Sequence, residues 1–186
     1  MRSLRSILLT GGAGFIGSAL TRALLKQPHL EHLVILDSLT YAGNRANLIG
    51  PDQDPRLNII EGDIGDEALA SELIEKFRCS GIMHLAAESH VDKSIDGPGD
   101  FIDTNIIGTF NMLEAARKYW QAAGRPDSFR FHPVSTDEVF GSLPADPAVQ
   151  FTEATAYDPR SPYSASKAAS DHLVRAWFET YGLPVC

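Results

Sequence analysis

A glycine-rich segment near the start of the chain constrains the fold more than any other feature of the sequence. The residues TGGAGFIG, from Thr10 to Gly17, follow a strand-like run and precede a helix-like stretch. Gly11, Gly14 and Gly17 have the spacing that allows a tight turn, close approach of the backbone to a phosphate, and close helix–strand packing. Because a helix N terminus offers free N–H groups to an anion, the segment predicts a strand–turn–helix unit that binds a dinucleotide diphosphate.

Apolar runs and helical patterns alternate along the rest of the chain. The first run covers residues 6–10, and the others cover 33–37, 57–61, 81–86 and 129–135. These runs are apolar on both faces, as in strands that are covered by helices on each side. The alternation predicts an α/β fold, a doubly wound parallel sheet of the Rossmann type that occupies residues 1–186.

Three helical segments carry recognisable start or stop signals. Asp66 is a candidate N-cap for a helix whose apolar stripe runs to Phe77, and a second stripe begins at Ile106 and ends near Gly124. A third helix is expected from Pro162 to the Gly182-Leu183-Pro184 breaker. The last residues, 184–186, read as the opening of a sixth strand, so we expect the chain to be truncated before a substrate domain.

Composition excludes several classes of function. The chain has 24 acidic and 16 basic residues, a net charge of −8, and no basic run, which argues against binding to nucleic acid or anionic membranes. Its two cysteines form no CxxC pair, which suits a reducing cytoplasm. The six histidines show no metal-ligand spacing, so no metal is expected. His84 and His132, inside strand-like runs, are expected to be satisfied core histidines.

An acidic residue follows the glycine turn at the distance that a dinucleotide site requires. Asp37 closes the second predicted strand, 20 residues after Gly17, where a carboxylate can bind the ribose hydroxyls. Since its charge would repel a 2′-phosphate, NAD is favoured over NADP. Asp63 and Ile64 follow the third strand, where a carboxylate could reach the adenine edge, although a helix-entry turn explains them equally well.

Candidate catalytic groups lie in two later segments. Tyr163 and Lys167, in YSASK, are one helical turn apart on one face. We expect the ammonium group and a bound nicotinamide to lower the pKa of Tyr163 so that it can accept a proton from a substrate hydroxyl. Thr136, Asp137 and Glu138 follow the fifth strand, where two adjacent acids can serve as acid and base. The alternative is that this segment only caps a turn or helix.

Six segments carry a resemblance to the dTDP-glucose 4,6-dehydratases of the extended short-chain dehydrogenase/reductase superfamily. They are TGGAGFIGS from Thr10, DSLTYAGN from Asp37, HLAAESHVDKS from His84, STDEVFG from Ser135, SPYSASKAASDHLVRAW from Ser161 and TYGLPV from Thr180. The glycine and YxxxK motifs are typical of the superfamily, whereas the Thr-Asp-Glu triplet is typical of the dehydratases. Lys93 and Phe140 stand where relatives often have Arg or Tyr.

The resemblance implies an NAD-dependent lyase reaction on a nucleotide sugar, with oxidation at C4, loss of water across C5–C6, and reduction at C6. Tyr163 would remove the C4 hydroxyl proton with help from Thr136 and Lys167, Glu138 would abstract the C5 proton, and Asp137 would protonate the leaving C6 hydroxyl. Ser89 and Thr136 would also contact the sugar. The implied NAD contacts also include Phe15, Ile16, Asp37, Ser38, Leu39, Thr40, Asp63, Ile64, Leu85, Ala86, Ala87, Glu88, Ser89 and Thr104.

Three readings of the function remain open on the sequence. The first is a dTDP-glucose 4,6-dehydratase that forms a 4-keto-6-deoxy sugar nucleotide for deoxysugar synthesis, with a UDP-sugar dehydratase as its rival. The second is a sugar-nucleotide epimerase, against which the Asp137–Glu138 pair argues. The third is a non-catalytic NAD-binding module, which would need neither Tyr163 nor Lys167. By resemblance, helices around 100–123 and 162–182 would pair two subunits into a homodimer.

Overall fold

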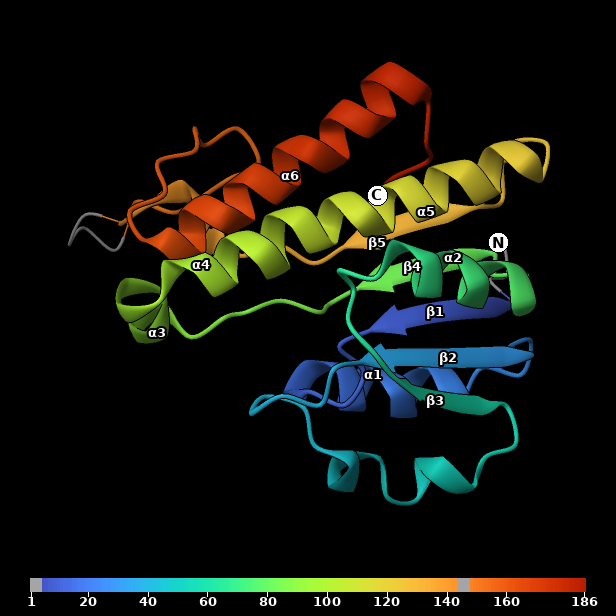
Figure 1. Cartoon of the computed structure of the whole chain (residues 1–186). Coiled ribbons are helices and arrows are strands. Elements are labelled where there is room, and N and C mark those ends of the chain that lie inside the picture. The colour runs from blue at the N-terminus through green and yellow to red at the C-terminus, as the bar shows by residue number, and fades with distance from the viewer. Residues whose placement is uncertain (1–4, 144–147) are drawn as a thin grey trace.

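The computed structural model describes residues 5–143 and 148–186, which form a parallel sheet flanked by helices (Figure 1). Its strands are β1 (Ser6–Thr10), β2 (His32–Asp37), β3 (Leu57–Glu61), β4 (Gly81–His84) and β5 (Arg130–Pro133). All neighbouring pairs are parallel, in the order β3-β2-β1-β4-β5. The predicted doubly wound fold is therefore confirmed. β4 and β5 end two residues earlier than predicted, because the chain leaves the sheet there.

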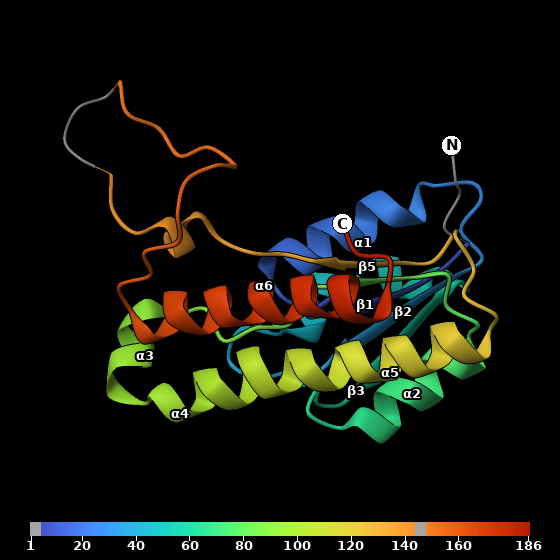
Figure 2. The same ribbon diagram turned by 90° about the horizontal axis from the view of Figure 1, so that it is seen from above.

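Helices cover both faces of the sheet. They are α1 (Phe15–Leu25) on one face and α2 (Glu67–Lys76), α5 (Thr109–Ala122) and α6 (Pro162–Tyr181) on the other (Figure 2). Successive β1 residues alternate between the two cores, since Ile7 and Leu9 pack on the α1 side and Leu8 packs with Ile74 and Met112. This alternation follows from the two-residue period of a strand, and it explains why strands covered on both faces are continuously apolar.

The predicted helix boundaries have physical causes that the structure makes visible. Oδ1 of Asp66 accepts a hydrogen bond from N of Leu69 at 2.9 Å, which confirms the predicted N-cap of α2. The α6 helix begins with a capping box between Ser161 and Ser164 and ends at Gly182, whose φ of 74° is left-handed. After this stop, Val185 forms one parallel bridge with Phe131.

The region between β4 and α5 contains helices that the sequence pattern did not predict. Two short helices, α3 (Val91–Asp96) and α4 (Pro98–Phe101), precede a π-helix, η3 (Ile102–Gly108), that runs into α5. A Cβ at Gly108 would lie 2.6 Å from Cδ1 of Ile64, so glycine permits this wide turn to pack closely. π-Helical turns occur frequently at functional sites, and this one lies at the same edge as the candidate site.

Three short 3-10 helices complete the described structure. They are η1 (Arg45–Leu48), η2 (Pro51–Gln53) and η4 (Asp137–Phe140). Within the described ranges, none of the helices has the length and apolarity that a bilayer crossing requires.

Candidate functional site

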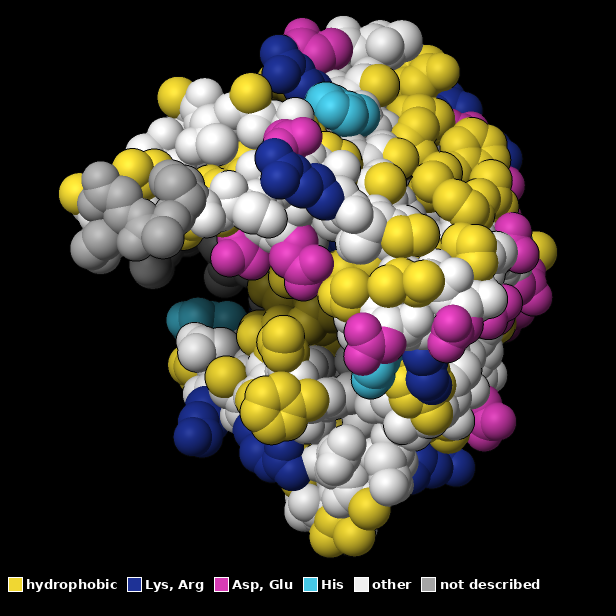
Figure 3. Space-filling view, turned by 90° about the vertical axis from the view of Figure 1, so that its left-hand side faces the viewer, with side chains coloured by type: hydrophobic (Ala, Val, Ile, Leu, Met, Phe, Trp, Pro, Cys, Tyr) yellow, Lys and Arg dark blue, Asp and Glu magenta, His cyan; other side chains and the backbone are white. Residues whose placement is uncertain are grey.

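A cavity of about 540 Å³ opens at the edge of the sheet where the strands end. Figure 3 looks onto this edge. β1 and β4 are adjacent here, although β2 and β3 lie between them in the chain, and such switch points are the usual ligand sites of doubly wound sheets. The predicted cofactor residues that line the cavity are Gly11, Gly14, Phe15, Ile16, Gly17, Asp37, Ser38, Thr40, Asp63, Ile64, Leu85, Ala86, Ala87, Glu88, Ser89, Thr104, Tyr163 and Lys167.

Leu39 is the predicted cofactor residue that the structure places elsewhere. Its side chain packs against the apolar core on the α1 side of the sheet rather than lining the cavity. Its φ of 51° is left-handed, which is uncommon for leucine. This backbone conformation turns the chain after β2 so that Ser38 and Thr40 line the cavity while Leu39 is directed into the core.

The glycine turn has the close contacts that its motif predicts. Gly11 has a φ of +70°, and a Cβ there would lie 2.8 Å from N of Ala86. A Cβ at Gly17 would lie 2.0 Å from O of Gly11. The α1 helix has no side-chain cap, and its first apolar residues, Phe15 and Ile16, are 91% and 63% exposed beside the cavity. Uncapped N–H groups beside an exposed apolar rim fit a ligand that has both an anionic and a flat apolar part.

Asp37 connects the glycine turn to the loop after β2. Oδ2 accepts a hydrogen bond from N of Ala13 at 2.8 Å, and Oδ1 accepts one from N of Leu39 at 2.9 Å. The side chain is buried, yet it also lines the cavity. A carboxylate has about four acceptor positions, so Asp37 can hold the two loops and still accept hydrogen bonds from a ligand.

A buried network centred on His84 supports the same edge and was only partly expected from the sequence. Oγ1 of Thr10 accepts hydrogen bonds from N of Leu85 and N of Ala86, both at 3.1 Å. Its own proton is then donated to Nδ1 of His84 at 2.8 Å, which leaves Nε2–H to donate to Oγ1 of Thr109 at 3.1 Å. Burial, and then the charge of Lys167, lower the pKa of His84 to about 3. His84 is thus a neutral, satisfied core histidine, as predicted.

Asn105 is a site residue that sequence reasoning missed. It is buried in the π-helix, where Oδ1 accepts from N of Glu88 at 2.9 Å and Nδ2 donates to O of Glu88 at 2.9 Å. Nδ2 also donates to Oγ of Ser166 at 2.8 Å. This amide therefore fixes the loop after β4 to α6. The only signal in the sequence was a run of three polar residues, Asp103-Thr104-Asn105, between apolar residues.

Tyr163 and Lys167 lie together on α6, where both are buried and both line the cavity. Nζ of Lys167 donates a hydrogen bond to O of Val134 at 2.7 Å, which ties the helix to the segment after β5. Burial lowers the pKa of Lys167, and the nearby charge of Asp171 raises it.

The prediction that Lys167 lowers the pKa of Tyr163 is wrong for the protein groups alone, because this pKa is raised. Burial is the largest cause, a hydrogen bond with Thr136 opposes it, and the charges of Glu138 and Asp137 raise the pKa further. The ammonium group of Lys167 is bound to a main-chain carbonyl instead of the phenol.

The acid pair lies within electrostatic range of the phenol, although neither acid lines the cavity. Asp137 and Glu138 are exposed at the start of η4, close enough to Tyr163 for both charges to act on its pKa. Oγ1 of Thr136 also caps η4 by accepting a hydrogen bond from N of Glu138 at 3.3 Å. Thr136 thus caps the 3-10 helix that carries Asp137 and Glu138, so the capping interpretation is compatible with the catalytic one.

The charged groups elsewhere at this edge do not form a candidate metal centre. Across residues 5–143 and 148–186, no three His, Cys, Asp or Glu side chains come together as metal ligands. His132 is exposed, so the prediction of a second core histidine is wrong. Its strand, β5, lies at the edge of the sheet, and Nδ1 lies 3.2 Å from Sγ of Cys186.

Sequence relatives match almost the whole chain. A dTDP-glucose 4,6-dehydratase from Salmonella typhimurium (strain LT2) is 54% identical over 187 residues, which cover 96% of this chain and 52% of that protein. A dTDP-glucose 4,6-dehydratase from Neisseria meningitidis serogroup B is 53% identical, and the match covers 97% of this chain and 51% of that protein. The chain therefore spans about half the length of the curated relatives that it matches.

Solved structures and a family profile agree with these relatives. A dTDP-glucose 4,6-dehydratase from Streptomyces venezuelae, crystallised with NAD bound, has a TM-score of 0.86 and 46% identity over 97% of this chain and 53% of its own. A UDP-glucose 4-epimerase from Brucella ovis in complex with NAD has a TM-score of 0.81 and 27% identity over 97% of this chain and 50% of its own. The profile described as GDP-mannose 4,6 dehydratase matches residues 8–186. Because this match covers most of the sequence, the chain belongs to the GDP-mannose 4,6 dehydratase family.

Proposed function

We propose that this chain provides the NAD site and the catalytic groups of a dTDP-glucose 4,6-dehydratase, a hydro-lyase that forms dTDP-4-keto-6-deoxyglucose. The observation that carries the proposal is that Tyr163 and Lys167 line the dinucleotide-type cavity while the charges of Asp137 and Glu138 act on Tyr163. The relatives that are 50–54% identical carry this name, which supports the choice of substrate.

The residues of the cavity fit NAD. The uncapped N terminus of α1 would bind the diphosphate, and Asp37 would accept hydrogen bonds from the adenosine ribose, with Asp63 and Ile64 near the adenine. Glu88, Ser89 and Thr104 would line the nicotinamide half. The solved relatives described above were crystallised with NAD, which supports this cofactor.

Each catalytic residue then has a role that its position allows. When bound, NAD would supply the redox chemistry by accepting a hydride from the sugar C4 and later returning it at C6. Tyr163 would take the C4 hydroxyl proton, with Thr136 and Ser89 hydrogen-bonded to the sugar and Lys167 supplying positive charge.

The 4-ketone acidifies the C5–H bond, so the next steps are the removal and delivery of protons. Glu138 would abstract the C5 proton and return a proton to C5 when C6 is reduced, and Asp137 would donate a proton to the departing C6 hydroxyl. Both side chains are exposed, and their charges act on Tyr163, which supports these roles.

The exposed face of α5 and α6 suggests that two copies of the chain associate. Phe110, Phe178 and Tyr181 of α5 and α6 are 38–48% exposed, and hydrophobic side chains gather at the upper right of Figure 3, where these helices lie. We propose that this face pairs two copies into a homodimer, which sedimentation equilibrium of the native chain and of Phe178→Glu would test. We also propose that the protein is cytoplasmic, which the two free thiols, Cys79 and Cys186, support.

The reaction is tested by incubating the NAD-loaded protein separately with dTDP-glucose, UDP-glucose and GDP-mannose. Mass spectrometry should show loss of one water from dTDP-glucose, with deuterium from the solvent incorporated at C5. A 4-epimer of unchanged mass would favour the epimerase alternative, and faster turnover of another nucleotide sugar would refute the dTDP assignment. NAD binding in titration calorimetry with no turnover of any sugar would favour a binding module.

A further inference from the structure

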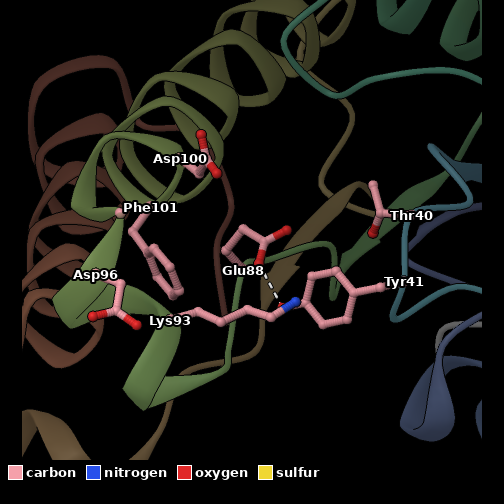
Figure 4. Close-up of a pocket in the computed structure, with 8 residues that line it drawn as sticks. Thr40, Tyr41, Glu88, Lys93, Asp96, Asp100 and Phe101 are labelled. Carbon is pink, nitrogen blue, oxygen red and sulfur yellow. Dashed lines mark hydrogen bonds between the residues drawn. The ribbon is translucent and has the colours of Figure 1, made fainter.

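A bridge of three side chains crosses from the loop after β2 to the segment after β4. The hydroxyl of Tyr41 donates a hydrogen bond to Oε2 of Glu88 at 2.6 Å, and Nζ of Lys93, from α3, lies 3.1 Å from the centroid of the Tyr41 ring. Figure 4 shows Lys93 and Tyr41 pointing toward one another from opposite sides, with Glu88 above the point where they meet. The phenol is thus held at its polar end and on its face.

The bridge joins two segments that line the cofactor cavity. Thr40 and Ala42, on either side of Tyr41, line this cavity, and so does Glu88. Tyr41 and Lys93 line instead a smaller cavity of about 440 Å³, which shares Thr40 and Glu88 with the larger one. The bridge therefore connects two segments of the larger cavity through residues that do not line it.

One end of the bridge is rigid and the other is a surface loop. Asn105 holds both the N–H and the C=O of Glu88, so that wall is fixed to the helices. Tyr41 is 56% exposed, which leaves the hydrogen bond and the cation–π contact as its principal attachments. Burial and the bond to Glu88 raise the pKa of Tyr41 to about 12, so the phenol remains a donor throughout the neutral range.

We propose that Tyr41, Glu88 and Lys93 form a clasp that closes over the bound dinucleotide and controls its release. The inference rests on the proposed function, because it needs NAD in the cavity. A reaction that oxidises and then reduces the same sugar uses one cofactor molecule twice, so the cofactor must stay bound between the two steps. Tyr41 and Lys93 lie outside the lining of the cavity, so they can lengthen the residence time without themselves contacting the cofactor.

The test measures the rate of NAD release by stopped-flow displacement from the native chain, Tyr41→Phe and Lys93→Met. Loss of one hydrogen bond to a charged group predicts release at least about tenfold faster for Tyr41→Phe. Loss of an exposed cation–π contact predicts about threefold for Lys93→Met. The association rate should not change. Lys76→Met is a matched control, since Lys76 lies over the ring of Phe77, remote from the cavity residues.

Each outcome decides between the two proposals. Faster release from both clasp variants, with Lys76→Met unchanged and equal urea unfolding for all chains, supports the clasp. Release within about twofold of the native rate in both variants would overturn the clasp while NAD binding stands. A native chain that binds no NAD in calorimetry would overturn the proposed function and the clasp together.

Discussion

Buried His84 should make the fold sensitive to mild acid. Its pKa is about 3 in the folded chain, against an ordinary value of about 6.5 in an unfolded one. Between these values the unfolded chain binds a proton that the folded chain excludes, so stability falls as the pH drops through this window. From pH 7 to pH 5 the linkage predicts a loss of about 2 kcal/mol from this one group, and the loss approaches about 5 kcal/mol below pH 3.

Urea unfolding at pH 7 and pH 5 separates this effect from that of other titrating groups. His84→Gln cannot bind the proton, and it should be less stable at pH 7 by about 1 to 3 kcal/mol because buried hydrogen bonds to Thr10 or Thr109 are lost. The stability gap between the native chain and His84→Gln should therefore shift by about 2 kcal/mol in favour of the variant at pH 5. His29→Gln, at an exposed position, serves as the control. Equal pH dependence in the native chain and His84→Gln would refute the reasoning.

The remaining predictions concern the catalytic groups and the glycine turn. Tyr163→Phe should slow the first oxidation by about 10² to 10⁴, measured as formation of reduced cofactor, and full activity would exclude Tyr163 as the base. Asp137→Asn and Glu138→Gln should still form reduced cofactor but eliminate water at least about 100-fold more slowly; failure at the first step would show that their roles are misassigned. Gly17→Ala should lower the free energy of unfolding by about 2 kcal/mol, because its Cβ meets O of Gly11 at 2.0 Å. Gly14→Ala, where the nearest atom lies at 3.3 Å, should cost less than about 1 kcal/mol, and the opposite ranking in urea unfolding would contradict the packing argument.

Local sequence patterns predicted the sheet and the cofactor cavity because their causes are local. A strand covered on both faces must be apolar throughout, and a turn that lies under a helix N terminus needs glycine where a Cβ would collide with backbone. The spacing from Gly17 to Asp37 was informative because the helix and strand between them have a nearly fixed length. Parallel strands then bring their carboxyl ends to one edge, which gathers most of the predicted site residues.

Contacts between distant segments set what the sequence could not predict. The π-helix depends on Gly108 packing against Ile64, and the importance of Asn105 depends on Glu88 and Ser166 reaching it. Leu39 adopts a left-handed backbone that no local pattern indicates. The pKa of Tyr163 depends on burial and on charges from another segment, so a YxxxK motif alone could not give its direction.

The raised pKa of Tyr163 has an electrostatic component that a single substitution can test. The charges of Asp137 and Glu138 both raise this pKa, so removal of one charge should make the phenolate easier to form. Asp137→Asn should lower the pKa of Tyr163 and shift the pH dependence of the first oxidation to lower pH, while exposed Asp92→Asn should not. An unchanged pH profile in Asp137→Asn would show that the side chain at position 137 does not act on the phenol, and an unchanged absorbance titration of the phenol would establish the same result directly.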